Sequence, residues 1–292
     1  VVDERLIVVL ASGRRRLEEK AQIELLASEM TARLCGLVPG GKAVRVRTLP
    51  FDLDRGLAGV VNLAGLLQRI AECEREVESA ERAAFARARG QLFLAFEPVV
   101  NPRKRLIAAY RLQACWRDGE GQLRSADELF DERVVGVYDA LVDGWLLEAC
   151  SARLAQPQAC KWTLVLPVRA ETLLAARFRL PYLAACRRLP LASSRHLVFE
   201  ITELPGTMPQ ARLREVAAYL APFALGIAVR VYPPLLTLDH FLGTGIRFVS
   251  LQDPPEPARL PLPSLLRLRE LARPAQLRTV LLGVTTESRL GE

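Results

Sequence analysis

Two glutamates in the run Phe199-Glu200-Ile201-Thr202-Glu203 are the residues whose type and spacing best fit metal chemistry in this chain. They stand at the carboxyl end of a predicted strand, and hard divalent cations prefer carboxylate oxygens as ligands. Both glutamates come from a single strand, which does not make a metal cage. The ends of the other predicted strands are almost all apolar or neutral. This contrast indicates an enzyme-like scaffold from which the chemistry has been removed.

Thiol or imidazole metal chemistry is not indicated elsewhere. There are six cysteines and two histidines, and no two cysteines have the Cys-x-x-Cys spacing of a zinc site. We interpret the cysteines as reduced thiols, His196 as the start of a strand and His240 as a loop residue. We therefore expect no cofactor. The cysteines are Cys35, Cys73, Cys115, Cys150, Cys160 and Cys186.

Composition and charge limit the class of protein. Half of the 292 residues are hydrophobic, which is enough for one large core or a large core with a smaller unit. The net charge of +7 comes mostly from arginines interleaved with glutamates, and only 6% of residues are aromatic, so we expect no nucleic-acid binding. No long apolar run or signal peptide is present. We predict a cytoplasmic chain that is a piece of a longer protein, and a membrane-tethered parent stays open.

The chain divides into three predicted parts. Residues 1–62 indicate a small α/β segment, with a strand, a helix, a Pro-Gly-Gly turn and a second strand. Residues 63–90 form one long predicted helix, rich in Ala, Glu and Arg, that connects this segment to the rest. Residues 91–292 alternate strands with helices, which is typical of a mainly parallel sheet or an α/β barrel.

Seven strands in a (β/α) order predict a TIM-like barrel that is one unit short at its carboxyl end. In such barrels the chemistry lies at the carboxyl ends of the strands. The expected helices span residues 137–154, 170–188, 209–221 and 262–272. The expected strands span residues 92–100, 106–115, 162–168, 196–202, 225–231, 246–251 and 279–284.

Four blocks of the third part resemble the EAL family of cyclic-di-GMP phosphodiesterases. The resemblance covers residues 91–292 and implies a TIM-like barrel with one antiparallel strand that hydrolyses cyclic di-GMP with two divalent metals. No single motif is complete. The blocks are Leu94-Ala95-Phe96-Glu97-Pro98-Val99-Val100, Leu106-Ile107-Ala108-Ala109-Tyr110-Arg111-Leu112-Gln113-Ala114-Cys115-Trp116, Phe199-Glu200-Ile201-Thr202-Glu203 and Gly283-Val284-Thr285-Thr286-Glu287.

Carried over residue by residue, the implied active site is mostly absent. The signature glutamate of the Glu-Ala-Leu motif falls on Arg111, so a cation stands where the family has a metal ligand. Glu200 matches the fourth-strand metal glutamate and is the single matching ligand position. Other family positions are also changed: the asparagine falls on Leu166, the paired aspartates around Tyr232 and Pro233, the catalytic lysine on Ser250, its partner aspartate on Gln252, and the seventh-strand glutamate on Leu282.

Two further comparisons with the family bear on ligand binding. Cys115 replaces the phosphate-contacting arginine of the family, and Glu97 replaces its first-strand glutamine. Residues 238–245 resemble the family's Asp-Asp-Phe-Gly-Thr-Gly segment, which would restore an aspartate ligand. We instead predict a plain turn there, because Gly226 fits the glycine that opens the fifth strand and the next strand starts at Ile246.

The first 62 residues more faintly resemble a partial GGDEF diguanylate-cyclase domain. Val1 and Val2 would then replace the two glycines that let the nucleotide approach the backbone, so this part would be inactive as well. An unrelated α/β segment is the alternative.

Three functions follow from these features. The first is a catalytically inactive GGDEF-EAL type signalling protein that binds an unknown protein partner, with a homodimer left open. The second is a metal-independent cyclic-di-GMP receptor, in which Arg111 would contact phosphate. The third is an active phosphodiesterase. An open basic pocket at the strand ends would favour the receptor, whereas a mouth plugged by Leu166, Tyr232 and Leu282 would favour the interaction module.

Overall fold

The computed structural model describes residues 60–101, 103–129, 136–156, 162–190, 194–204, 208–232, 237–253 and 260–284. Most of the expected α/β segment at 1–62 lies outside these residues, and so do Pro233 and the Thr285-Thr286-Glu287 part of the fourth family block.

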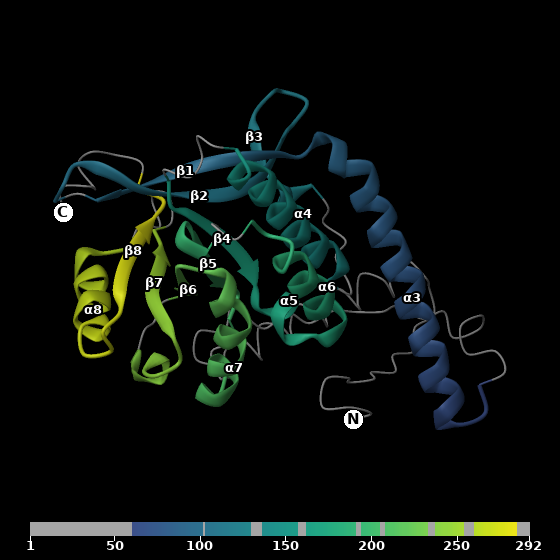
Figure 1. Cartoon of the computed structure of the whole chain (residues 1–292). Coiled ribbons are helices and arrows are strands. Elements are labelled where there is room, and N and C mark those ends of the chain that lie inside the picture. The colour runs from purple at the N-terminus through teal and green to yellow at the C-terminus, as the bar shows by residue number, and fades with distance from the viewer. Residues whose placement is uncertain are drawn as a thin grey trace.

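One mixed sheet curls into a half barrel (Figure 1). Its order is β1-β2-β4-β5-β6-β7-β8, with the short β3 paired to β2. β1 and β2 are antiparallel, and the ladders from β2 to β8 are parallel. The strands are β1 (Phe93–Asn101), β2 (Leu106–Arg117), β3 (Leu123–Ser125), β4 (Leu164–Arg169), β5 (Leu197–Thr202), β6 (Gly226–Val231), β7 (Ile246–Gln252) and β8 (Arg278–Leu282).

This arrangement confirms the predicted fold class. All seven predicted strands are present, each with ends within two residues of the expected ones, and one of them is antiparallel, as the resemblance implied. β3 was not predicted. It has three exposed residues, which is too short a run for a period-2 pattern to be recognised.

Helices follow β2, β4, β5 and β7 and lie along one side of the curled sheet (Figure 1). The strand residues that face them, such as Leu166, Phe199 and Val229, are fully buried in the main hydrophobic core. The helices are α4 (Val137–Leu154), α5 (Ala170–Leu174), α6 (Ala176–Cys186), α7 (Gln210–Leu220) and α8 (Leu262–Ala272).

The predicted connector is a single helix, α3 (Leu63–Ala88), which continues into the 3-10 turn η2 (Arg89–Gln91). Its amino terminus is capped by Asn62, whose Oδ1 accepts a hydrogen bond of 2.8 Å from the Gly65 amide. Its carboxyl-terminal half packs beside α4 (Figure 1).

The segment that resembles the family's aspartate motif forms a turn, as predicted. It contains the 3-10 turn η7 (Asp239–Phe241), and Gly243 and Gly245 have φ angles of +67° and +87°. Strand β7 then begins at Ile246. His240 is half-buried in this turn, and His196 directly precedes β5.

Within the described residues, no helix is both long enough and apolar enough to cross a lipid bilayer.

Candidate functional site

The register of the sheet decides which side chains meet inside the half barrel. Glu200 pairs with Pro167 on one side and with Ala228 on the other, and Arg230 pairs with Ser250. Partners in a ladder share a face, and side chains alternate along a strand. Glu200, Arg230 and Ser250 therefore project from the same face of the sheet, away from the helices.

These side chains form one compact group with residues of β1 and β2. The Glu200 carboxylate accepts hydrogen bonds from Arg111 Nε at 2.8 Å and from Arg230 Nη2 at 2.7 Å, both to Oε2. The Ser250 hydroxyl donates to Glu200 Oε1. Arg111 Nη1 also lies 3.3 Å from Glu97 Oε2. We call Glu97, Arg111, Glu200, Arg230 and Ser250 the barrel cluster.

The barrel cluster fixes Glu200 as a buried carboxylate. Burial raises its pKa, but the guanidinium groups of Arg111 and Arg230 and the Ser250 hydroxyl outweigh burial, so the pKa is lowered from its ordinary value. The Glu200 side chain is only 1% exposed. Burial lowers the pKa of Arg111, but Glu200 and Glu97 more than offset this effect and raise it. Both groups remain charged as a pair.

The residues present do not fit the two divalent metals that the resemblance implies. A metal at Glu200 would need further oxygen ligands close to the carboxylate. The nearest groups are instead two guanidinium cations, which already bind both oxygens of Glu200 with Ser250. Among the described residues, no group of three or more His, Cys, Asp or Glu side chains is placed to hold a metal.

The structure corrects the expected role of Leu166. Leu166 pairs with Phe199 and both are fully buried in the core under the helices, so Leu166 neither faces the barrel interior nor plugs its mouth. Pro167 is the residue beside Glu200. Leu282 is on the same face as Glu200 and is buried, and Tyr232 is half-buried.

Of the predicted site residues, the structure brings Arg111 and Glu200 into direct contact. Their sequence separation of 89 residues is bridged by the parallel ladders of β2, β4 and β5. Arg230 is the member that sequence reasoning missed. The available signal was an arginine near the end of the fifth predicted strand, two residues before Tyr232.

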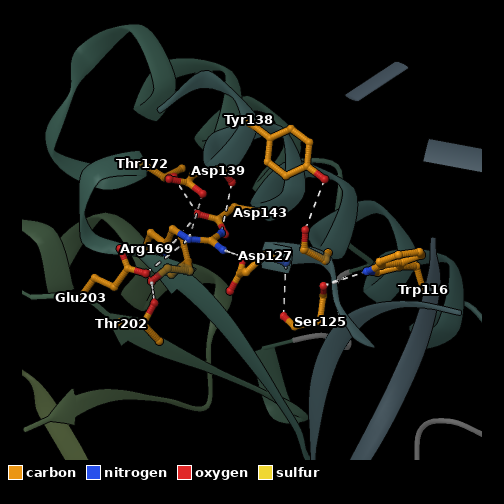
Figure 2. A network of polar contacts seen from close by, with 12 residues as sticks. Trp116, Ser125, Asp127, Tyr138, Asp139, Asp143, Arg169, Thr172, Thr202 and Glu203 are labelled. Carbon is orange, nitrogen blue, oxygen red and sulfur yellow. Dashed lines mark hydrogen bonds and ion pairs between the residues drawn. The ribbon is translucent and has the colours of Figure 1, made fainter. Parts of the chain in front are cut away.

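A second buried charge cluster lies at the carboxyl ends of β4 and β5 (Figure 2). Arg169 is the last residue of β4, and its Nη1 donates to Asp143 Oδ1 at 2.6 Å. Its Nε lies 3.6 Å from Asp139 Oδ1 and 3.7 Å from Glu203 Oε1, and its Nη2 binds Asp127. We call Arg169, Asp127, Asp139, Asp143 and Glu203 the rim cluster.

The rim cluster holds one cation among four carboxyl groups. Asp143 also accepts hydrogen bonds from the Arg169 amide at 2.9 Å and the Thr172 hydroxyl at 2.6 Å. Burial nevertheless raises the pKa of Asp143 to about 6, because the charges of Arg169 and the hydrogen bonds do not fully compensate it. Glu203 has a φ of 55°, in the left-handed region that an ordinary residue adopts only at a cost.

Sequence reasoning missed the rim cluster. It predicted the strand end at Val168, one residue before Arg169, and did not relate this end to the helix that precedes it. The available signal was the pair Asp139 and Asp143, which lie four residues apart and so share one face of α4.

The cysteines within the described residues, Cys73, Cys115, Cys150 and Cys186, are free thiols, as predicted. Burial raises the pKa of Cys115, and it raises that of Cys150 and Cys186 to about 12. Such thiols are poor nucleophiles at neutral pH, so they take no part in a reactive site.

The curled sheet with one antiparallel strand defines a class of fold, and solved structures that share it include proteins with EAL domains. No family model matches the chain, and no curated protein matches it either. At the sequence identities found, the similarity shows the fold alone.

Three of these structures illustrate the similarity. The PaMucR phosphodiesterase in complex with c-di-GMP is 17% identical, with a TM-score of 0.53 over 71% of this chain and 87% of its own. The Bacillus subtilis YkuI protein, with an EAL domain in complex with c-di-GMP and calcium, is 14% identical, with a TM-score of 0.54 over 70% of this chain and 51% of its own. The apo form of Vibrio cholerae LapD S helix-GGDEF-EAL is 12% identical, with a TM-score of 0.57 over 73% and 53% respectively.

Proposed function

We propose that this chain is a catalytically inactive regulatory protein of cyclic-di-GMP signalling, which acts through protein contacts of its EAL-type barrel. The observation that carries the proposal is the barrel cluster. Arg111 and Arg230 both bind the Glu200 carboxylate, so the one glutamate that matches a metal ligand of the resembling family is neutralised by protein cations.

The link to cyclic di-GMP rests on the fold. The PaMucR phosphodiesterase and the YkuI protein were solved in complex with c-di-GMP, and both share this fold. In the YkuI structure the ligand is accompanied by calcium. In the present chain, a cation at the corresponding carboxylate would be repelled by two guanidinium groups, which supports a role without hydrolysis.

A domain arrangement is part of the proposal. The barrel would span residues 91–292, with α3 as the connector and residues 1–62 as a partial GGDEF-like domain. The length of α3 supports a connector, since a helix of 26 residues spans about 39 Å.

The first test combines an activity assay with calorimetry on the full chain. Cyclic di-GMP is incubated with the protein and magnesium or manganese, and linear product is measured by chromatography. Cyclic di-GMP is then titrated into the protein in a calorimeter, with and without magnesium. We expect no product and no heat in either condition.

Each other outcome names a different function. Metal-dependent product would overturn the proposal in favour of an active phosphodiesterase. Micromolar or tighter binding without metal would overturn it in favour of a receptor. Arg230→Met would then remove the binding, since the Arg230 side chain is 14% exposed beside Glu200, whereas Arg267→Met on the exposed face of α8 would serve as the matched control.

A further inference from the structure

Helix α4 begins without a capping side chain of its own. Its N-cap residue is Gly136, which has a φ of 70° and offers no side-chain oxygen to the first turn. The capping oxygen comes from α3 instead, because Glu81 Oε2 accepts a hydrogen bond of 3.0 Å from the Tyr138 amide. Glu81 is only 1% exposed. A carboxylate is also the favoured charge at a helix amino terminus.

Glu81 sits in the middle of the face by which α3 docks. Val77, Glu81 and Phe85 are four residues apart and therefore lie on one side of the helix. Val77 packs against a small buried cluster that contains Val137. The Phe85 ring meets the Tyr138 ring edge to face, with 5.8 Å between centroids. The docked face of α3 is thus centred on the first turn of α4.

On their other side, the first two turns of α4 contact the barrel rim (Figure 2). Asp139 follows Tyr138 directly, and Asp143 is one turn further along. Both bind Arg169 at the end of β4, and Arg169 in turn pairs with Glu203 just after β5. The Tyr138 hydroxyl also donates to the Ala126 carbonyl oxygen at 3.3 Å, which lies beside Asp127. The first two turns of α4 are therefore held by α3 on one side and by Arg169 on the other.

We propose that Glu81 is a coupling residue, through which the docking of α3 on α4 sets the order of the barrel rim at Arg169 and Glu203. When α3 is docked, α4 is capped and Asp139 and Asp143 are fixed for Arg169. When α3 separates, the first turn of α4 loses its cap, and the rim cluster loses the geometry that compensates its buried charges. This device goes beyond the proposed function and holds whether or not cyclic di-GMP binds.

The expected size of the effect follows from the missing N-cap of α4. Loss of an N-cap costs about 1 kcal/mol in measured helices, which corresponds to roughly fivefold in a local opening equilibrium. The rim cluster amplifies such a change because buried charges tolerate little displacement of their partners. The order of a helix end with no cap of its own, beside four carboxyl groups, therefore depends on the docking of α3.

Hydrogen exchange measured by mass spectrometry on the full chain tests the coupling. In Glu81→Ala we expect roughly fivefold faster exchange in the first turn of α4, and a rise of similar size in peptides that cover Arg169 and Glu203. Glu81→Gln keeps an oxygen acceptor without the charge and should give a smaller change at the same places. The matched control is Glu78→Ala, one turn earlier on α3, where Glu78 pairs with Arg82 and Arg177 at the surface.

Two outcomes would overturn the proposal. One is faster exchange in α4 with unchanged exchange at Arg169 and Glu203, which would show a cap without coupling. The other is a uniform rise that also includes β7 and β8, which would show a general loss of stability. A double variant, Glu81→Gln with Arg169→Lys, separates these roles further. Coupled residues give a combined fold-change different from the product of the single fold-changes, whereas independent residues give that product.

Discussion

The barrel cluster and the rim cluster both combine arginine with acidic side chains, but in different proportions. In the barrel cluster, two guanidinium groups surround Glu200 and lower its pKa against the effect of burial. In the rim cluster, one guanidinium group is shared by four carboxyl groups, and burial raises the pKa of Asp143 to about 6. The charges of the barrel cluster balance, with two arginines and two glutamates, whereas the rim cluster has a surplus of acid.

The difference shows why burial alone does not decide ionisation. Glu200 and Asp143 are almost equally inaccessible, at 1% and 2% exposure. What differs is the number of cations within reach of each carboxylate. In the barrel cluster the two guanidinium groups keep Glu200 ionised. In the rim cluster the ionisation of Asp143 depends on its surroundings.

The largest effect should come from removing the shared cation of the rim cluster. Arg169→Met leaves Asp139 and Asp143 buried without their guanidinium partner, so we expect a loss of about 3–5 kcal/mol in the free energy of unfolding. Urea denaturation measures it. The control is Arg267→Met, whose exposed pair with Glu270 should be worth at most about 0.5 kcal/mol. Equal losses of unfolding free energy in the two variants would contradict the conclusion that Arg169 stabilises the buried carboxyl groups.

A smaller loss is expected when the barrel cluster loses its carboxylate. Glu200→Gln keeps an acceptor for one arginine but leaves Arg230 without a compensating charge and Arg111 with Glu97 alone, and we expect a loss of about 3 kcal/mol at neutral pH. The same denaturation experiment checks it. If Glu200→Gln were as stable as the unchanged protein, the barrel cluster would contribute nothing as an ion group.

The pH dependence of the two clusters should have opposite signs. The lowered pKa of Glu200 means that its contribution to stability is present above its unfolded pKa and is lost as pH falls through the folded value. Asp143 has a raised pKa, from 3.8 to about 6, so the folded state binds more protons and stability falls as pH rises through that window.

Asp143→Asn isolates the second of these effects. It should remove a decrease of about 2–3 kcal/mol that the unchanged protein shows between about pH 4 and about pH 7. Urea denaturation at the two pH values measures the difference. An Asp143→Asn protein whose stability still falls by the same amount would assign the effect to another group.

The smallest expected effect is that of a chelator. Because protein cations neutralise Glu200, incubation with EDTA should leave the melting temperature of the described fold unchanged. Differential scanning calorimetry with and without chelator checks this. A fall of several degrees would indicate a metal that contributes to the fold and would count against a closed barrel cluster.

The sequence predicted the sheet well and the charge clusters poorly. Strands such as β5 were predictable because an apolar run is short and ends in a recognisable motif. Arg111 and Glu200 were found because they occupy positions of a known family motif. Their contact was not predictable, since it depends on a ladder register that sets residues from three strands on one face.

The rim cluster shows the limit more sharply. Arg169 looks in sequence like any surface arginine at the end of a strand, and Asp139 and Asp143 look like the polar face of a helix. Only the packing of α4 on β4 buries the three together. Glu81 is similar, because a glutamate between Val77 and Phe85 predicts nothing until the next helix is found to lack a cap.

The capping of α4 by a residue 57 positions earlier also has a practical consequence for cutting the chain. A boundary drawn between α3 and β1 would remove Val77, Glu81 and Phe85 together. Such a fragment would retain every strand and yet start its first large helix with bare amides and an exposed apolar face. The smallest piece suitable for expression therefore begins with α3. If a barrel truncated after α3 aggregates, the cause would be the loss of α3 and not an unstable barrel.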